Sequence, residues 1–177
     1  ITKLILTELN VPRIEIASAR VSSGEHESVA KICEWARLSG NINRIEILGF
    51  IDNGISIKWI KDVGGKVINL LAKGSERHCR LQLKKTPEEH WSDIRKEINH
   101  AINEGLDVNI YLEDWSNGIT KSPQYVYDMV NSLKDLPIKR FMLPDTLGIM
   151  NPNEVFEYCK RMVNNFPHLH FDFHAHN

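Results

Sequence analysis

Short β-branched segments alternate with longer amphipathic segments along nearly the whole chain of 177 residues. This alternation constrains the fold more than any other feature of the sequence. The segments that predict strands are residues 13–18, 44–50, 67–74, 107–115, 140–146 and 168–177. A helical segment separates each strand from the next, and strict βα alternation of this kind predicts a parallel sheet covered by helices.

Helix-start signals support the helical segments. Thr86-Pro87-Glu88-Glu89 forms a capping box with proline at the first helical position. Ser122-Pro123 and Asn151-Pro152 open two further helices in the same way. Residues 26–40 and 55–64 supply two more helices, and residues 1–10 predict the second half of an amphipathic helix.

The number of strands indicates a particular α/β fold. No glycine-rich phosphate loop follows the first strand, which argues against a doubly wound nucleotide-binding sheet. A TIM (β/α)8 barrel of about 250 residues has eight strands. We therefore expect residues 1–177 to be one partial (β/α)8 barrel domain, comprising about strands 2–7 with their helices.

The net charge and the cysteines indicate which partners and which cellular compartment to expect. The formal net charge is −1, which does not favour a nucleic-acid or membrane partner. Cys33, Cys79 and Cys159 show no paired spacing, so we expect thiols in a reducing, cytoplasmic compartment. Cys33 and Cys159 lie on apolar helical faces and are expected to be small core residues.

The two-residue period of a strand sorts each segment into an outward and an inward face. Leu169, Phe171, Phe173 and Ala175 are expected to face the outer helices, and the even-numbered residues between them the interior. Barrel active sites lie at the carboxyl ends of the strands, so late inward residues are the candidates. They are Leu48, Leu71, Tyr111, Glu113, Thr146, His174 and His176.

Four polar residues occupy earlier inward positions: Glu15, Glu46, Asn69 and Asn109. One interpretation is a polar layer satisfied by mutual hydrogen bonds or by an arginine from a strand outside this chain. The alternative is a role in orienting a substrate.

His174 and His176 are two residues apart on the last predicted strand, so their imidazoles project side by side. Both can bind one cation such as zinc or iron, while added carboxylate and substrate oxygens suit manganese or magnesium. Two ligands do not complete a metal site. The alternative is a structural or solvent-exposed pair.

Several motifs resemble one enzyme family. LPDTLGIMNP (143–152) and FHAHN (173–177) resemble two signatures of the isopropylmalate, homocitrate and citramalate synthase family. RIEIASARVS, EILGF, NLLAKGS and NIYLEDWSNG resemble the citramalate synthase branch in particular. The similarity covers about residues 4 to 177.

This resemblance implies a metal-dependent acyltransferase that condenses acetyl-CoA with an α-keto acid in branched-chain amino-acid biosynthesis. The citramalate branch implies pyruvate as the acceptor. The cofactor would be a divalent metal (Mn, Zn, Mg or Co), and the full-length enzyme would be a homodimer.

The resemblance also implies roles for individual residues. His174 and His176 match the family's metal-binding histidines, and Thr146 matches the threonine that binds the keto-acid carboxylate. Glu113 matches a glutamate that handles the proton of the acetyl-CoA methyl group. Leu48, Leu71 and Tyr111 match positions that shape the pocket for the keto-acid side chain.

This sequence also departs from the family pattern. The family's first strand with its Arg-Asp pair, its last strand with an asparagine ligand, and its C-terminal regions have no counterpart here. We therefore expect these residues alone to be inactive. The alternatives are a 2-isopropylmalate or homocitrate synthase, a metal-dependent lyase resembling hydroxymethylglutaryl-CoA lyase, and an inert partial barrel.

Overall fold

The computed structural model describes residues 1–176 and contains one sheet of six parallel strands. Each strand pairs with the next one in the sequence, so the spatial order is β1-β2-β3-β4-β5-β6. The strands are β1 (Ile14–Ser18), β2 (Ile45–Phe50), β3 (Val67–Lys73), β4 (Asp107–Glu113), β5 (Ile138–Asp145) and β6 (Phe171–Ala175). The predicted parallel sheet is confirmed.

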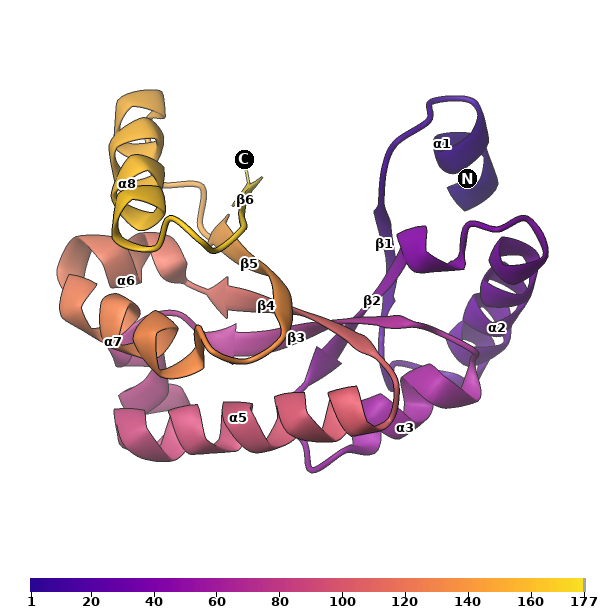
Figure 1. Ribbon diagram of the computed structural model, residues 1–177, viewed down its shortest axis with the longest axis horizontal. Helices are drawn as coiled ribbons and strands as arrows, with labels where there is room; N and C mark the ends of the chain where they lie inside the picture. Colours follow the sequence, from indigo (N-terminus) through magenta and orange to yellow (C-terminus); the bar gives the residue numbers. More distant parts are fainter. Residues whose placement is uncertain (177) are drawn as a thin grey trace.

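Helices cover the outer face of the curled sheet, and its concave side opens between β1 and β6 (Figure 1). This arrangement is a partial (β/α)8 barrel, as predicted. The main helices are α1 (Thr2–Thr7), α2 (Ser23–Leu38), α3 (Ile55–Asp62), α5 (Pro87–Asn103), α7 (Pro123–Leu133) and α8 (Pro152–Asn165), with a short 3-10 turn η1 (Ile42–Arg44) before β2. Across residues 1–176, every helix is too short or too polar to cross a membrane.

The predicted helix starts are confirmed, two of them by reciprocal capping hydrogen bonds, whereas α7 begins at Pro123 without a side-chain cap from Ser122. The Glu89 N–H donates to the Thr86 hydroxyl at 3.2 Å, and the Glu89 carboxylate accepts the Thr86 N–H at 2.8 Å. Asn151 and Glu154 make the same reciprocal cap at the start of α8. These caps satisfy backbone donors that the helix itself leaves unpaired.

Two short helical segments were not predicted. The first comprises α4 (Glu76–His78) and the π-turn η2 (Cys79–Leu83), and the second is α6 (Trp115–Lys121). The prediction that the fourth strand extends to residue 115 was wrong, because Asp114 adopts φ 65° and turns the chain out of the sheet. The last strand begins at Phe171 instead of residue 168, and its predicted end at Asn177 lies outside the described residues.

The hydrophobic core lies between the outward faces of the central strands and the helices. Its fully buried strand residues are Ile45, Ile47, Ile68, Leu70, Val108, Ile110 and Leu112. The edge strand β6 is less covered, and Phe173 remains 37% exposed although its ring meets the Trp115 ring. Cys33 is buried as predicted, whereas Cys159 is only half-buried.

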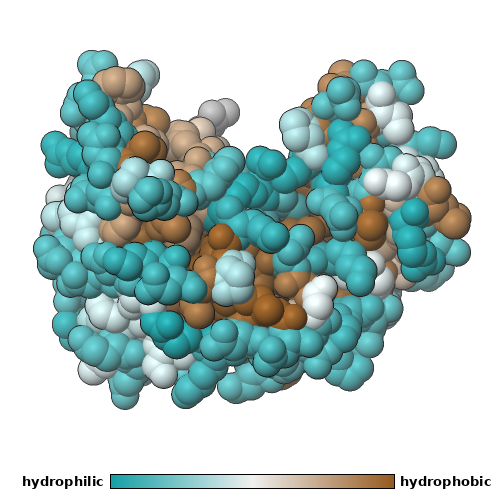
Figure 2. Space-filling view, viewed as in Figure 1, coloured by the Kyte–Doolittle hydropathy of each residue, from teal (hydrophilic) through white to brown (hydrophobic). Residues whose placement is uncertain are grey.

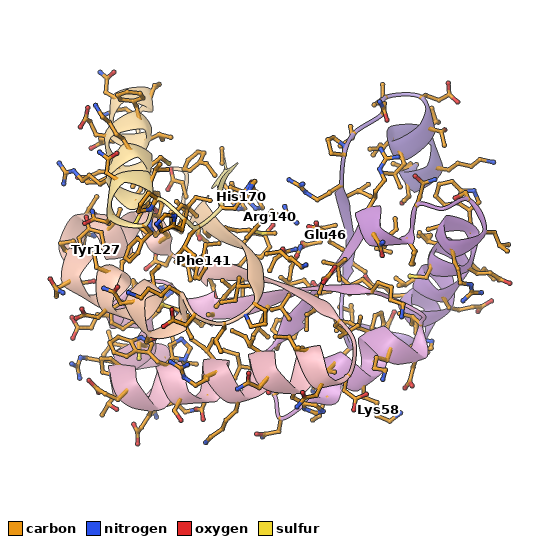
Figure 3. The ribbon with its side chains drawn as sticks, viewed as in Figure 1. Glu46, Lys58, Tyr127, Arg140, Phe141 and His170 are labelled. Atoms are coloured by element: carbon orange, nitrogen blue, oxygen red, sulfur yellow. The ribbon has the colours of Figure 1, made fainter. Side chains whose placement is uncertain are left out.

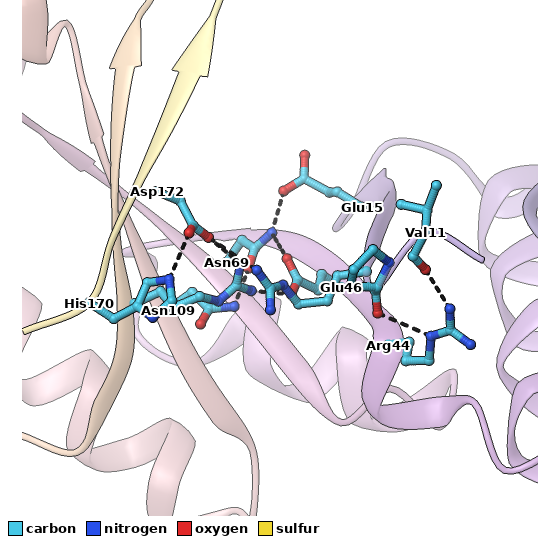
Figure 4. Close-up of polar contacts among 11 residues, drawn as sticks. Val11, Glu15, Arg44, Glu46, Asn69, Asn109, His170 and Asp172 are labelled. Carbon is cyan, nitrogen blue, oxygen red and sulfur yellow. Dashed lines mark hydrogen bonds and ion pairs between the residues drawn. The ribbon is translucent and has the colours of Figure 1, made fainter. Parts of the chain in front are cut away.

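Inward polar side chains join into one network, called here the polar layer. Its members are Glu15, Glu46, Asn69, Asn109, Arg140 and Asp172. Asn69 donates to Glu15 at 2.6 Å and to Glu46 at 3.1 Å, and Asn109 donates to Asn69 at 2.8 Å (Figure 4). The predicted mutual hydrogen bonds are therefore confirmed.

Arg140 supplies the positive charge of the polar layer. It forms ion pairs with Glu46 and Asp172, and only 10% of its side chain is exposed. Figure 3 shows Arg140 and Glu46 directed toward each other across the concave side. An arginine from β5 of this chain thus contributes to satisfying the polar layer, together with the mutual hydrogen bonds.

Candidate active site

A pocket of about 180 Å³ lies at the carboxyl ends of the strands, directly beyond the polar layer. Its lining residues are Glu15, Leu48, Leu71, Tyr111, Glu113, Pro144, Thr146, His174 and His176. All seven site residues predicted from the sequence line this one pocket. Strand parity predicted that these residues face inward, and the register between five neighbouring strands brings them to the same level of the barrel.

The two histidines lie side by side at the carboxyl end of β6, His174 in the strand and His176 directly after it. The ring centroids of His174 and His176 are 4.7 Å apart, and the ring planes differ by 4°. The Nδ1 atom of His174 is 3.1 Å from the Tyr111 hydroxyl oxygen. Because this contact occupies Nδ1, it fixes the ring and leaves Nε2 as the nitrogen available to a ligand.

Burial keeps the groups in this contact neutral. Burial, followed by the neighbouring charges of Glu15 and Glu46, raises the pKa of Tyr111. Burial and the adjacent His176 lower the pKa of His174. A neutral imidazole has a free lone pair, which is the form that binds a metal ion.

Glu113 lies at the end of β4 and is bound by a lysine that the sequence reading missed. The Lys73 ammonium forms an ion pair with the Glu113 carboxylate, and the two residues are partners in the β3–β4 register. The exposed fractions of the two side chains are 19% and 25%. Lys73 shares the inward parity of Asn69 and Leu71, so strand periodicity could have identified it.

Thr146 is oriented by the turn after β4. The Asp114 N–H donates to the Thr146 hydroxyl oxygen at 2.9 Å. The Asp114 carboxylate is buried and accepts hydrogen bonds from Ser75 and Asn117, both at 2.7 Å. Because the Thr146 oxygen already accepts one hydrogen bond, its own proton is available to donate to a ligand.

The donor set fits part of a divalent metal site. Two neighbouring imidazoles are suitable ligands, and Tyr111 orients one of them as an outer hydrogen-bond partner. Within residues 1–176, no group of three or more His, Cys, Asp or Glu side chains is arranged to hold a metal ion. His174 and His176 could therefore supply two ligands, and the others must come from substrate, solvent or further protein groups.

A wider groove of about 590 Å³ adjoins the pocket between the two edge strands. Arg13 and Glu15 line it from the β1 side, and Asp172 and His174 line it from the β6 side. Figure 2 shows the molecule notched between the arm that carries α8 and the arm that carries α1 and α2. The pocket is thus open laterally toward this groove.

These groups can together recognise a small carboxylate-bearing ligand. Thr146 offers a hydroxyl donor, His174 and His176 offer imidazole nitrogens, and Glu113 offers a carboxylate for proton transfer. Leu48 and Leu71 add an apolar wall. This combination suits polar chemistry at one end of a small molecule whose other end is apolar.

Comparison with known proteins identifies a matching family and several related enzymes. A model of the HMGL-like family matches residues 3–177. Homocitrate synthase from Sulfolobus acidocaldarius is 24% identical over 97% of this chain and 36% of its own length. The homocitrate synthase of Sulfurisphaera tokodaii is 28% identical over the same shares. The chain therefore spans about a third of the length of these relatives.

Solved structures share the fold. HMG-CoA lyase from Brucella melitensis superimposes with a TM-score of 0.74 at 21% identity, covering 97% of this chain and 62% of that one. Hydroxymethylglutaryl-CoA lyase from Pseudomonas aeruginosa gives a TM-score of 0.72 at 14% identity, covering 97% and 58%. Because the family match extends over residues 3–177, the chain belongs to the HMGL-like family.

Proposed function

We propose that the complete protein containing this chain condenses acetyl-CoA with a small α-keto acid, and that pyruvate is the preferred acceptor, giving citramalate. The observation that carries this proposal is the pocket itself. It combines a free hydroxyl donor, two imidazoles and a carboxylate with an apolar wall in about 180 Å³. Pockets for drug-sized ligands measure about 300–1,000 Å³, so this one suits a smaller acid.

The side chains divide between recognition and chemistry. Thr146 donates a hydrogen bond to the keto-acid carboxylate, and Leu48 and Leu71 pack against the substrate's methyl group. Tyr111 holds His174 and closes one side of the pocket. Fixing the acceptor in this way turns a reaction between two molecules into a step within one complex.

Proton transfer is assigned to Glu113. Its carboxylate takes a proton from the acetyl-CoA methyl group, or positions the group that takes it, and the methyl carbon then attacks the keto carbonyl, whose oxygen takes up a proton. Water then hydrolyses the thioester and releases CoA with the acid product. His174 and His176 would hold a divalent cation such as Mn, Zn, Mg or Co. A bound cation supplies Lewis-acid polarisation of the keto acid.

The apolar wall supports pyruvate over the acceptors of related synthases. 2-Oxoglutarate would bring a second carboxylate against Leu48 and Leu71, and burying an unpaired charge there is strongly unfavourable. The nearby Lys73 ammonium is already paired with Glu113. 2-Oxoisovalerate is apolar but needs more volume. The relatives compared above are homocitrate synthases, so the acceptor is the part of the proposal that most needs an experiment.

Three further features belong to the same proposal. Residues 1–177 form one catalytic domain whose remaining barrel strands other segments supply, and the alternation of strands and helices supports this. The resemblance to the synthases supports a homodimer, and the unpaired cysteines support a cytoplasmic location.

An assay of the complete protein tests the proposal. With Mn²⁺ or Mg²⁺ present, release of CoA from acetyl-CoA is measured with pyruvate, 2-oxoisovalerate and 2-oxoglutarate, and the products are identified by mass spectrometry. We expect citramalate and the highest kcat/KM with pyruvate. Cleavage of hydroxymethylglutaryl-CoA without any condensation would instead establish the lyase alternative.

A further inference from the structure

Lys73 occupies the last position of β3 and faces the barrel interior. Its ammonium binds the Oε2 atom of Glu113 from the neighbouring strand. Both side chains are mostly shielded from solvent, so the pair is weakly screened and more directional than a surface ion pair. Glu113 lines the pocket, whereas none of the other Lys–carboxylate pairs among the described residues includes a pocket-lining residue.

Two helices hold the backbone of Lys73. Strand β2 pairs with β3 only as far as Leu71, so the Lys73 N–H has no strand partner on that side. It donates instead to Nε2 of His90 on α5, at 3.1 Å. The Lys73 carbonyl accepts the Tyr125 hydroxyl from α7 at 2.9 Å.

His90 is suited to this contact because it is neutral. Only 1% of the residue is exposed, and burial followed by the charge of Lys85 lowers the pKa of His90 to about 4. Its Nε2 can therefore accept the Lys73 N–H at any pH near neutrality. Side chains from α5 and α7 thus hold Lys73 at the position where β2 no longer pairs with β3.

We propose that Lys73 is a positioning residue for the condensation and acts through Glu113, with His90 and Tyr125 fixing its backbone. The inference rests on the function proposed above, in which Glu113 handles the acetyl methyl proton. Lys73 binds Oε2, which holds the carboxylate turned so that Oε1 is directed to the substrate. In that step a methyl C–H bond breaks, the proton passes to Glu113, and the electron pair moves onto the thioester carbonyl.

Kinetics of the complete protein with acetyl-CoA and pyruvate test this role. We expect Lys73→Met to lower kcat by about 10- to 100-fold, part of the contribution of one acid–base group, while KM for pyruvate changes by less than about threefold. Lys73→Arg keeps the charge and should recover most of kcat. Lys61→Met, which breaks an ion pair with Glu104 outside the barrel, is the matched control and should leave kcat unchanged.

A double variant separates positioning from a general structural effect. If Lys73 acts through Glu113, Lys73→Met causes no further loss in a Glu113→Gln background. Losses that multiply, or a Lys73→Met enzyme that matches the Lys61→Met control, overturn the inference. Circular dichroism and thermal melting check the fold, and Lys73→Gln with Lys73→Arg decides the result if the Met variant does not fold. A wild-type protein that condenses no keto acid overturns the proposed function, and this inference with it.

Discussion

The polar layer and the pocket occupy the same barrel interior but differ in how their polar groups are satisfied. In the layer, the carboxylates and amides bind each other and Arg140. In the pocket, the Thr146 proton and the His174 Nε2 atom remain available for a ligand. Inward-facing residues therefore stabilise the fold in the polar layer, whereas inward-facing residues at the strand ends are available to bind a ligand. Substitutions in the two regions should accordingly affect different measurements.

The strongest test of this difference uses two histidines of the same parity, His174 in β6 and His170 directly before it. In the complete protein, His174→Ala should remove bound divalent metal and lower turnover by on the order of a thousandfold or more, because a cation supplies several kcal/mol of transition-state stabilisation. His170→Ala is the matched control, since His170 binds Asp172 of the polar layer instead of lining the pocket. Elemental analysis and steady-state kinetics measure both variants. Unchanged metal content and turnover in His174→Ala would contradict the assignment.

The polar layer is tested by stability. Arg140→Met removes the close cation of the buried Glu46 and leaves only the more exposed Arg13, whose Nε is 3.7 Å away. Losing one partner of a buried ion pair costs about 3–5 kcal/mol, and Arg13 should offset part of this loss. Urea unfolding of the complete protein should show this decrease. Arg80→Met, which breaks an exposed pair with Glu76, should leave the free energy of unfolding nearly unchanged.

A second substitution makes this test specific. Adding Glu46→Gln to Arg140→Met removes the buried negative charge that Arg140 had neutralised, so part of the lost stability should return. Equal unfolding free energies for Arg140→Met and Arg80→Met would show that the layer is not the stabilising region.

His90 on α5 accepts a hydrogen bond from Lys73, and its lowered pKa implies that the stability of the fold depends on pH. Above pH 6.5 both the folded and the unfolded chain have a neutral His90. As the pH falls through 6.5, only the unfolded chain gains the proton, until the folded-state pKa of about 4 is reached. Stability should therefore decrease by about 2 kcal/mol between pH 7 and pH 5 through this residue.

Thermal melting at several pH values measures this effect. His90→Gln retains an acceptor for the Lys73 N–H but cannot titrate, so its melting temperature should fall less between pH 7 and pH 5 than that of the wild type. His168→Gln, at an exposed position, should behave like the wild type. Identical acid dependence in all three proteins would remove His90 as the cause.

The smallest expected effect concerns acceptor selectivity. Leu71→Ala shortens a side chain of the apolar wall, enlarges the pocket, and should shift the preference from pyruvate toward 2-oxoisovalerate. A single methylene in an apolar pocket changes discrimination by about 1–3 kcal/mol, so the ratio of kcat/KM values should change by at least about 10-fold. Leu81→Ala, at an exposed position outside the pocket, is the control. An unchanged ratio would show that another part of the enzyme selects the acceptor.

Most of the fold could be predicted because periodicity and capping signals act locally. The alternation of segments identified all six strands, and parity brought seven site residues into one pocket. Parity also places Lys73 and Arg140 inward, so these two residues could have been found from the sequence. The partners of Arg140 could not, because the β4–β5 register shifts between Val108 and Asn109. The partner of Lys73 follows from the β3–β4 register, which the sequence alone does not give.

The turn after β4 was also beyond sequence reasoning. Asp114 reads as a continuation of an apolar strand, yet it adopts a left-handed conformation held by hydrogen bonds to Ser75 and Asn117. Those partners lie on different elements, and only the assembled fold brings them together. Local propensity cannot report a conformation that tertiary contacts impose.

The strict β1-to-β6 order of the sheet has a consequence for how the chain folds during synthesis. Each strand pairs with the one made immediately before it, so structure can grow unit by unit with short loop closures. The Arg140–Glu46 ion pair is different because it joins residues 94 positions apart. We expect this pair to form only after β5 has emerged, so that the polar layer is a late closing step which secures the earlier units against partial unfolding.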